Sequence, residues 1–91
     1  MRDEESSNIV RAIVARNVCA LRREAHLSQK ALSDMVCMNR TFLSDIERCK
    51  GNPSLDVVVK IANGLDVPIT RLFEGAEGCP PYRLSDDSES E

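Results

Sequence analysis

The sequence lacks tryptophan and has few aromatic side chains of any kind. Phe42, Phe73 and Tyr82 are the three aromatic residues among 91, or 3% of the chain. Strands of β-sandwiches and barrels draw on aromatic and β-branched residues, whereas a core of Leu, Ile, Val, Ala and Met suits thin helical packing. The composition therefore favours an all-α protein. A chain of this length fits one domain with a small core, and such domains often gain stability by oligomerising.

A long apolar run is also missing. The apolar stretch nearest the N-terminus is interrupted by Arg11 and Arg16, which leaves it far short of the ~18–20 apolar residues that a membrane span needs. Residues 1–8 are acidic and polar, unlike the basic start of a signal peptide. We therefore expect a cytoplasmic protein that does not associate with a membrane.

The residue types that carry catalysis or bind metals are few and scattered. The chain has one histidine, His26, and four cysteines without a CxxC spacing: Cys19, Cys37, Cys49 and Cys79. Zinc ligands typically lie roughly two to four residues apart in pairs, and no Gly-rich phosphate loop or acid–base set is visible. We expect no enzymatic activity, no metal and no cofactor. In a reducing compartment the cysteines are expected to be free thiols.

The formal net charge of −3 is unevenly distributed along the chain. Acidic residues collect near both ends, whereas residues 8–75 carry ten basic and seven acidic side chains, a net charge of +3. We divide the chain into a polar leader (1–8), a folded domain (9–75) and an acidic tail (76–91). The Gly, Pro, Ser and acidic residues of the tail are typical of disorder. The basic balance of the central part is compatible with a nucleic-acid partner.

Apolar residues recur every three or four positions in five segments, which predicts five short helices. The first is expected to begin near Asn8, and Ser28, Asn39 and Ser54 are expected to cap the next three. Pro68 suits the first turn of the fifth helix. The residues expected to face the core are, in chain order, Val10, Ile13, Val14, Val18, Leu21 and Ala25; Ala31, Leu32, Met35 and Val36; Leu43 and Ile46; Leu55, Val58, Ile61, Ala62 and Leu65; and Ile69, Leu72 and Phe73.

The segment Leu27–Ile46 places two short capped helices on either side of a turn of about three residues. A turn that short makes the helices cross steeply, so the residues at the crossing must be small or apolar. Ser33 is the small residue, and Met38, Leu43 and Ile46 are apolar. A helix of this width fits the major groove of B-DNA. The face of the second helix opposite the crossing carries Arg40, Thr41, Ser44, Asp45 and Arg48.

The stretch from about Val14 to Phe73 resembles the Xre family of phage-repressor-like helix-turn-helix regulators. The shared series is Leu21-Arg22, Leu27-Ser28-Gln29, Leu32, Ile46-Glu47-Arg48, Asn52-Pro53-Ser54-Leu55, Ile61-Ala62 and Leu65. Within the family, Asn39–Ser44 is similar to the recognition helix of restriction–modification controller proteins. The resemblance implies a repressor-like fold of five helices and a transcription regulator that binds double-stranded DNA.

The resemblance also implies roles for individual positions. Arg40, Thr41 and Ser44 would face base edges, and an arginine there can donate two hydrogen bonds to a guanine. The residues expected to contact phosphates are Gln29, Arg48, Lys50 and Asn52.

Other implied roles are structural. Arg22 and Glu47 would form an internal ion pair between the first helix and the recognition helix. His26 and Cys37 stand where the family usually has glycine, so a left-handed backbone is expected at both. Some relatives contact RNA polymerase through an acid at the position of Asp34, which makes RNA polymerase a candidate partner.

The fifth helix brings together Ile69, Leu72 and Phe73, an apolar patch that so small a domain is not expected to bury. A two-fold axis through this patch would form a homodimer. Its recognition helices would lie about 34 Å apart, one turn of DNA, so the site would be a palindrome with half-sites ~10 bp apart. The first helix around Ile9 and Ile13 is the alternative interface. The alternative function is a protein-interaction module of the antitoxin type, for which the acidic ends of the chain are suited.

Overall fold

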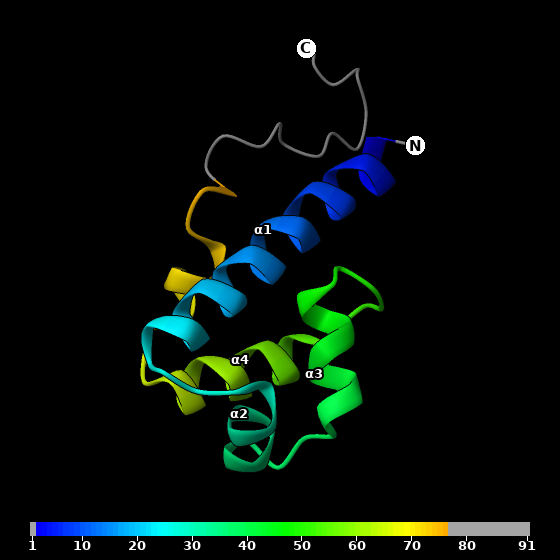
Figure 1. Ribbon diagram of the computed structural model, residues 1–91. Helices are drawn as coiled ribbons and strands as arrows, with labels where there is room; N and C mark the ends of the chain where they lie inside the picture. The colour runs from blue at the N-terminus through cyan, green and yellow to red at the C-terminus, as the bar shows by residue number, and fades with distance from the viewer. Residues whose placement is uncertain (1, 77–91) are drawn as a thin grey trace.

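The computed structural model describes residues 2–76, and all regular structure in this part of the chain is helical (Figure 1). The elements are α1 (Arg2–Glu24), α2 (Gln29–Met35), α3 (Arg40–Glu47), α4 (Leu55–Leu65) and the 3₁₀-helix η1 (Ile69–Phe73). The predicted all-α class is confirmed. The fifth predicted helix is a short 3₁₀-helix, and the predicted acidic tail lies, apart from its first residue, outside the described residues.

Helix α1 begins at Arg2, and the predicted start at Asn8 is wrong. Asn8 therefore lies inside the helix and does not cap it, and its Oδ1 accepts a hydrogen bond of 2.8 Å from the Arg11 guanidinium one turn later. No glycine or proline interrupts residues 2–24. The helix therefore runs through most of the segment that the sequence predicts as a leader.

The other three α-helices begin at the predicted caps. Ser28 Oγ accepts from the backbone N–H of Ala31 at 3.0 Å, and Ser54 Oγ accepts from that of Val57 at 3.2 Å. Asn39 Oδ1 accepts from the N–H of Thr41 at 2.7 Å. Each cap satisfies a donor that the helix itself leaves without a partner, and each typically stabilises by ~1 kcal/mol.

All four α-helices end in the same way. The residue that follows the last turn has a left-handed backbone, with φ of 59° at His26, 55° at Cys37, 62° at Cys49 and 59° at Asp66. At the end of α2, Cys37 N–H donates to Asp34 O at 3.2 Å and Met38 N–H donates to Ser33 O at 2.8 Å. This pair of bonds is the Schellman motif. The left-handed backbone predicted at His26 and Cys37 is confirmed.

The core lies where α1 packs against α3, α4 and η1, while α2 joins it through α3 and α4 (Figure 1). Its buried residues are Val14, Val18 and Leu21 of α1; Leu32 of α2 and Val36 just after it; Leu43 and Ile46 of α3; Val58, Ile61 and Ala62 of α4; and Leu72 of η1. Helix α2 approaches α4 closely at Gly64, where an added Cβ would overlap Val36 Cγ1. A side chain at residue 64 would therefore displace Val36 from this contact.

Three residues predicted to face the core do not. Met35 is 54% exposed, Leu55 is 72% exposed, and Ala25 is also exposed. Met35 ends the short helix α2, and the buried contact with α4 is made by Leu32 and by Val36 just after the helix. Leu55 is the first residue of α4 and precedes the turn that reaches the core at Val58. No helix among residues 2–76 is long and apolar enough to cross a membrane.

Candidate nucleic-acid interface

Helices α2 and α3 meet across a turn of four residues, Val36–Asn39. The crossing is lined as predicted: Ser33 is 1% exposed, and Leu43 and Ile46 are buried. The Ser33 hydroxyl donates to Lys30 O at 2.8 Å, which satisfies its polar group inside the crossing. The two helices therefore form a tightly packed helix-turn-helix unit.

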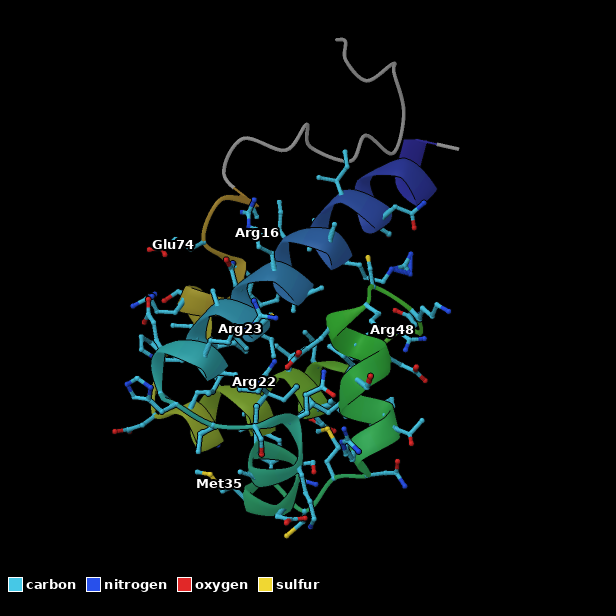
Figure 2. All side chains as sticks on the ribbon, viewed as in Figure 1. Arg16, Arg22, Arg23, Met35, Arg48 and Glu74 are labelled. Carbon is cyan, nitrogen blue, oxygen red and sulfur yellow. The ribbon has the colours of Figure 1, made fainter. Side chains whose placement is uncertain are left out.

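The face of α3 turned away from this crossing is open to solvent. Arg40 and Thr41 in its first turn are exposed, and Ser44 is half-buried. Arg48 is exposed at the end of the helix (Figure 2). At about 100° per residue, these four positions lie within an arc of about 100°. The structure thus gathers all three predicted base-contacting residues on one helical surface.

Three of the four predicted phosphate contacts gather at the C-terminal end of the same helix, and the fourth, Gln29, lies at the start of α2. Lys50 and Asn52 lie in the α3–α4 loop just after Arg48, and all three side chains are exposed. The loop turns back because Cys49 has a left-handed backbone and Lys50 N–H donates to Asp45 O at 2.7 Å. Arg40 lies eight residues before Arg48, which is a distance of about 12 Å along the axis of α3. Base-facing and phosphate-facing candidates therefore occupy one continuous surface.

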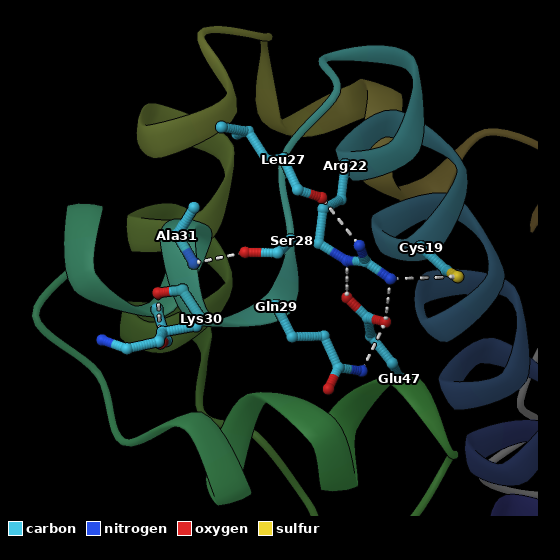
Figure 3. Close-up of polar contacts among 9 residues, drawn as sticks. Cys19, Arg22, Leu27, Ser28, Gln29, Lys30, Ala31 and Glu47 are labelled. Atoms are coloured by element: carbon cyan, nitrogen blue, oxygen red, sulfur yellow. Dashed lines mark hydrogen bonds and ion pairs between the residues drawn. The ribbon is translucent and has the colours of Figure 1, made fainter.

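An ion pair between Arg22 and Glu47 holds α3 against α1 (Figure 3). Arg22 Nε lies 2.7 Å from Glu47 Oε2, and its Nη2 donates to Oε1 at 3.0 Å. The remaining guanidinium nitrogen, Nη1, donates to Leu27 O at 2.8 Å. The side chains are only 10% and 4% exposed. The pair that the resemblance implies thus joins α1, α3 and the linker before α2 at one buried point.

Burial and pairing act in opposite directions on the Glu47 carboxyl. Burial raises its pKa. Hydrogen bonds from Arg22 and Gln29, together with the Arg22 charge, lower the pKa by more than burial raises it. The net pKa of Glu47 is below its usual value. The hydrogen bond to Glu47 is the main cause that raises the pKa of Arg22. Both groups are therefore charged in the folded protein at neutral pH.

Gln29 takes part in the same network, which the sequence did not indicate. Its Nε2 donates to Glu47 Oε1 at 3.0 Å, and the residue is half-buried at the first position of α2. An amide carries two N–H donors, and this bond uses one of them. Gln29 is thus fixed in place by Glu47 while a second donor remains for a phosphate.

The predicted dimer patch is only partly on the surface. Leu72 has no exposed area, so it belongs to the core and cannot contact a partner subunit. The side-chain amide of Asn17 donates to Leu72 O at 2.8 Å, which draws η1 against α1. Ile69 and Phe73 are half-buried and pack against the core. The sequence missed Leu55 and Val59, one turn apart on α4, which are the exposed apolar residues of that helix.

The cysteines of the described residues do not form a site. Cys37 and Cys49 are exposed and Cys19 is half-buried, all as free thiols. Within residues 2–76, no group of three His, Cys, Asp or Glu side chains could hold a metal ion.

Comparison with known proteins identifies the class to which this surface belongs. The helix-turn-helix family model matches residues 20–72, which include α2, α3, α4 and most of η1. The chain belongs to this helix-turn-helix family. The resemblance to phage-repressor-like regulators and restriction–modification controllers is confirmed by individual relatives.

Three curated relatives match with similar strength. The immunity repressor protein of Bacillus phage phi105 is 32% identical over 59 residues, which cover 65% of this chain but only 41% of the repressor. The control protein C.SmaI of Serratia marcescens is 29% identical over 64 residues, or 70% of this chain and 76% of that protein. The control protein C.MunI of Mycoplasma sp is 38% identical over 58 residues, or 63% of this chain and 78% of that protein.

Solved structures agree with this assignment. The restriction–modification controller protein C.AhdI from Aeromonas hydrophila superimposes with a TM-score of 0.67 at 28% identity, covering 69% of this chain and 96% of that one. A hypothetical transcription factor from Neisseria, NHTF, gives a TM-score of 0.69 at 31% identity over 70% of this chain and 74% of that one.

Proposed function

We propose that the protein is a transcription regulator of the controller type, which binds a specific double-stranded DNA site with α3 in the major groove. The observation that carries the proposal is the exposed face of α3. It presents Arg40, Thr41, Ser44 and Arg48 on a packed helix-turn-helix unit, in a chain that is similar to control proteins over most of their length. None of the relatives described above is named as an enzyme.

In this arrangement the first turn of α3 reads the bases. Arg40 and Thr41 enter the groove first, and Arg40 can donate two hydrogen bonds to a guanine. Ser44 lies one turn later on the same face. Arg48, Lys50 and Asn52, with the second N–H of Gln29, bind phosphates on either side and fix the depth of the helix.

We further propose that the protein acts as a homodimer on a palindromic site. Because Leu72 is buried, the interface is assigned to Ile69 and Phe73 together with Leu55 and Val59 of α4. Leu55 and Phe73 line the same surface groove, and η1 packs against α4. A two-fold axis at this surface makes an isologous contact. Half-sites one turn of DNA, ~10 bp, apart are then expected.

Asp34 is the one residue proposed for RNA polymerase. Its carboxylate is exposed on α2 and accepts a hydrogen bond of 3.0 Å from Lys30 one turn before it. A partner with a basic surface would have to displace this weak surface pair. The contact would thus be additional to DNA binding.

Selection of bound sequences from random DNA tests the proposed function. We expect a palindrome with half-sites ~10 bp apart, and steep weakening of binding with salt, because Arg48 and Lys50 displace counterions. Two or three cationic contacts per subunit give a log–log slope of roughly −4 to −5 for a dimer. Failure to enrich any sequence, together with a slope near zero, would contradict the proposal and favour the protein-interaction alternative.

Replacing Leu55 by aspartate is expected to convert the dimer to a monomer. A charge at the centre of an apolar contact cannot be buried without a partner, whereas on the monomer Leu55 is 72% exposed, so the fold should survive. Sedimentation at tens of micromolar and the helical circular dichroism signal measure the two effects. Met35→Asp is the matched control, because Met35 is similarly exposed, on α2. A Leu55→Asp protein that stays dimeric would exclude this surface, and Ile9→Asp would then test α1.

A further inference from the structure

A groove of about 570 Å³ opens between the N-terminal half of α1, the end of α3, the start of α4 and Phe73. Its apolar lining includes Val10 and the buried residues Val14, Ile46 and Val58. Leu55 and Phe73, which the proposed dimer contact also uses, line it as well. Among the residues whose side chains the structure describes, the charged ones that line the groove are Arg11 and Lys50, and none of its described lining residues is acidic. The groove is therefore suited to a segment that is partly apolar and carries negative charge.

The groove adjoins the proposed DNA-binding surface. Cys49, Lys50, Gly51 and Asn52 form one of its edges, and two of these, Lys50 and Asn52, are proposed phosphate contacts. An acidic segment in the groove would place its carboxylates beside Lys50, the same side chain that is proposed to bind a DNA phosphate.

The chain itself supplies a segment of this chemistry. Phe73 lines the groove, the described residues end at Ala76, and fifteen residues follow, 77–91. They contain the apolar pair Tyr82 and Leu84, then a run of acids, Asp86, Asp87, Glu89 and Glu91; their net charge is −4. The nine residues from Phe73 to Tyr82 can span up to ~30 Å, whereas the part of α1 that lines the groove, residues 7–14, is about 10 Å long. The segment therefore reaches every part of the groove.

We propose that the groove binds residues 77–91 of the same chain, with Tyr82 and Leu84 against its apolar lining and the acidic run beside Lys50 and Arg11. Because the segment is tethered, its effective concentration is in the millimolar range, and a weak contact is enough to fill the groove for much of the time. The regulatory consequence rests on the proposed function: the bound tail and DNA compete for Lys50, so an occupied groove weakens DNA binding.

Thiol labelling of the full chain with N-ethylmaleimide tests the docking without DNA. Cys49 lines the groove, whereas Cys37 is exposed outside it and serves as the internal control. In the variant Tyr82→Ser/Leu84→Ser, we expect Cys49 to react about twofold faster or more. A tethered segment that fills the groove for about half of the time or more shields Cys49 for that share of the time, and the variant removes this shielding. The rate at Cys37 should not change. Mass spectrometry of the two peptides measures both rates.

Two results of this labelling would overturn the proposal. One is a Cys49 rate that does not respond to the Tyr82 and Leu84 substitutions. The other is protection of Cys49 that grows with protein concentration and persists in the variant, which would mean that the proposed dimer contact at Leu55 and Phe73 extends across the groove and leaves no room for residues 77–91.

Binding to a random-sequence duplex tests the regulatory step. Neutralising the acidic run (Asp86→Asn, Asp87→Asn, Glu89→Gln and Glu91→Gln) should tighten binding, and the gain should shrink once Tyr82→Ser/Leu84→Ser has already released the segment. If neutralising the acidic run raises DNA affinity equally with and without Tyr82→Ser/Leu84→Ser, the tail acts only through long-range charge. That result would overturn the proposed competition between the tail and DNA for Lys50. Tail-dependent protection of Cys49 in a protein that binds no DNA would support docking while refuting the proposed function.

Discussion

Replacing Glu47 by alanine is expected to lower the free energy of unfolding by about 3–5 kcal/mol, as is typical when one partner of a buried ion pair is removed. The guanidinium of Arg22, 10% exposed, would keep its bond to Leu27 O but lose both bonds to the carboxylate. Gln29 would lose its acceptor as well. A domain of this size has a small reserve of stability, so the variant should be largely unfolded or close to it.

Urea unfolding followed by circular dichroism measures this loss, and Asp34→Ala is the matched control. Asp34 also pairs with a basic residue, Lys30, but both side chains are well exposed, so its removal should cost under about 1 kcal/mol. The double variant Arg22→Met/Glu47→Leu should be more stable than Glu47→Ala, because no buried charge is left alone. Similar small losses for Glu47→Ala and Asp34→Ala would show that the buried pair contributes no more than a surface pair.

The same carboxyl makes stability depend on pH in a defined direction. Because the pKa of Glu47 is lowered in the folded protein, its contribution is fully present above its unfolded pKa, about 4.3. The contribution is lost as the pH falls through the lower, folded value. The wild-type protein should therefore lose stability below about pH 4 more steeply than Glu47→Ala does.

Features that depend on neighbouring residues in the sequence were predicted well. Ser28, Asn39 and Ser54 cap helices because a cap needs only its own side chain and the next turn of backbone. The left-handed positions His26 and Cys37 were predicted from the resemblance, since glycine usually stands there. Asn8 failed as a cap because α1 already begins at Arg2, which leaves Asn8 inside the helix with its side chain bonded to Arg11.

Burial was predicted less well, because periodicity shows which face turns inward but not how far the neighbouring elements extend. Leu55 lies on the inward stripe of α4 but precedes the part of the helix that the core covers. Leu72 was assigned to an interface, yet η1 is short enough for Asn17 to draw it against α1 and bury the side chain. Only the three-dimensional arrangement separates these cases.

The candidate site also has one part that the sequence predicts and one part that it does not. The exposed face of α3 follows from the spacing of Arg40, Thr41, Ser44 and Arg48 and from the resemblance. The bond from Gln29 to Glu47 joins residues 18 positions apart, and no local pattern in the sequence indicates it. It links the start of α2, where a phosphate is expected, to the ion pair that orients α3.

Replacing Arg40 by alanine is expected to weaken binding to the selected DNA site by about 1–3 kcal/mol per half-site, hence by about 2–6 kcal/mol for a symmetric dimer. The loss should also relax the preference at one base pair in each half-site. The reason is geometric: Arg40 lies in the first turn of α3, its side chain is exposed, and a guanidinium can bond two acceptors of one guanine. Binding isotherms on the selected site and on its single-base variants measure both effects.

Lys50→Ala is the control for charge, because Lys50 is equally exposed but lies beyond α3, in the loop assigned to phosphates. Its removal should weaken binding to every sequence alike and reduce the salt slope by about one per subunit. Arg40→Ala should instead leave random-sequence binding nearly unchanged while the selected site loses its advantage. If the two variants lose the same affinity on selected and random DNA, Arg40 contacts the backbone, and base readout would pass to Thr41 and Ser44 on the same face of the helix.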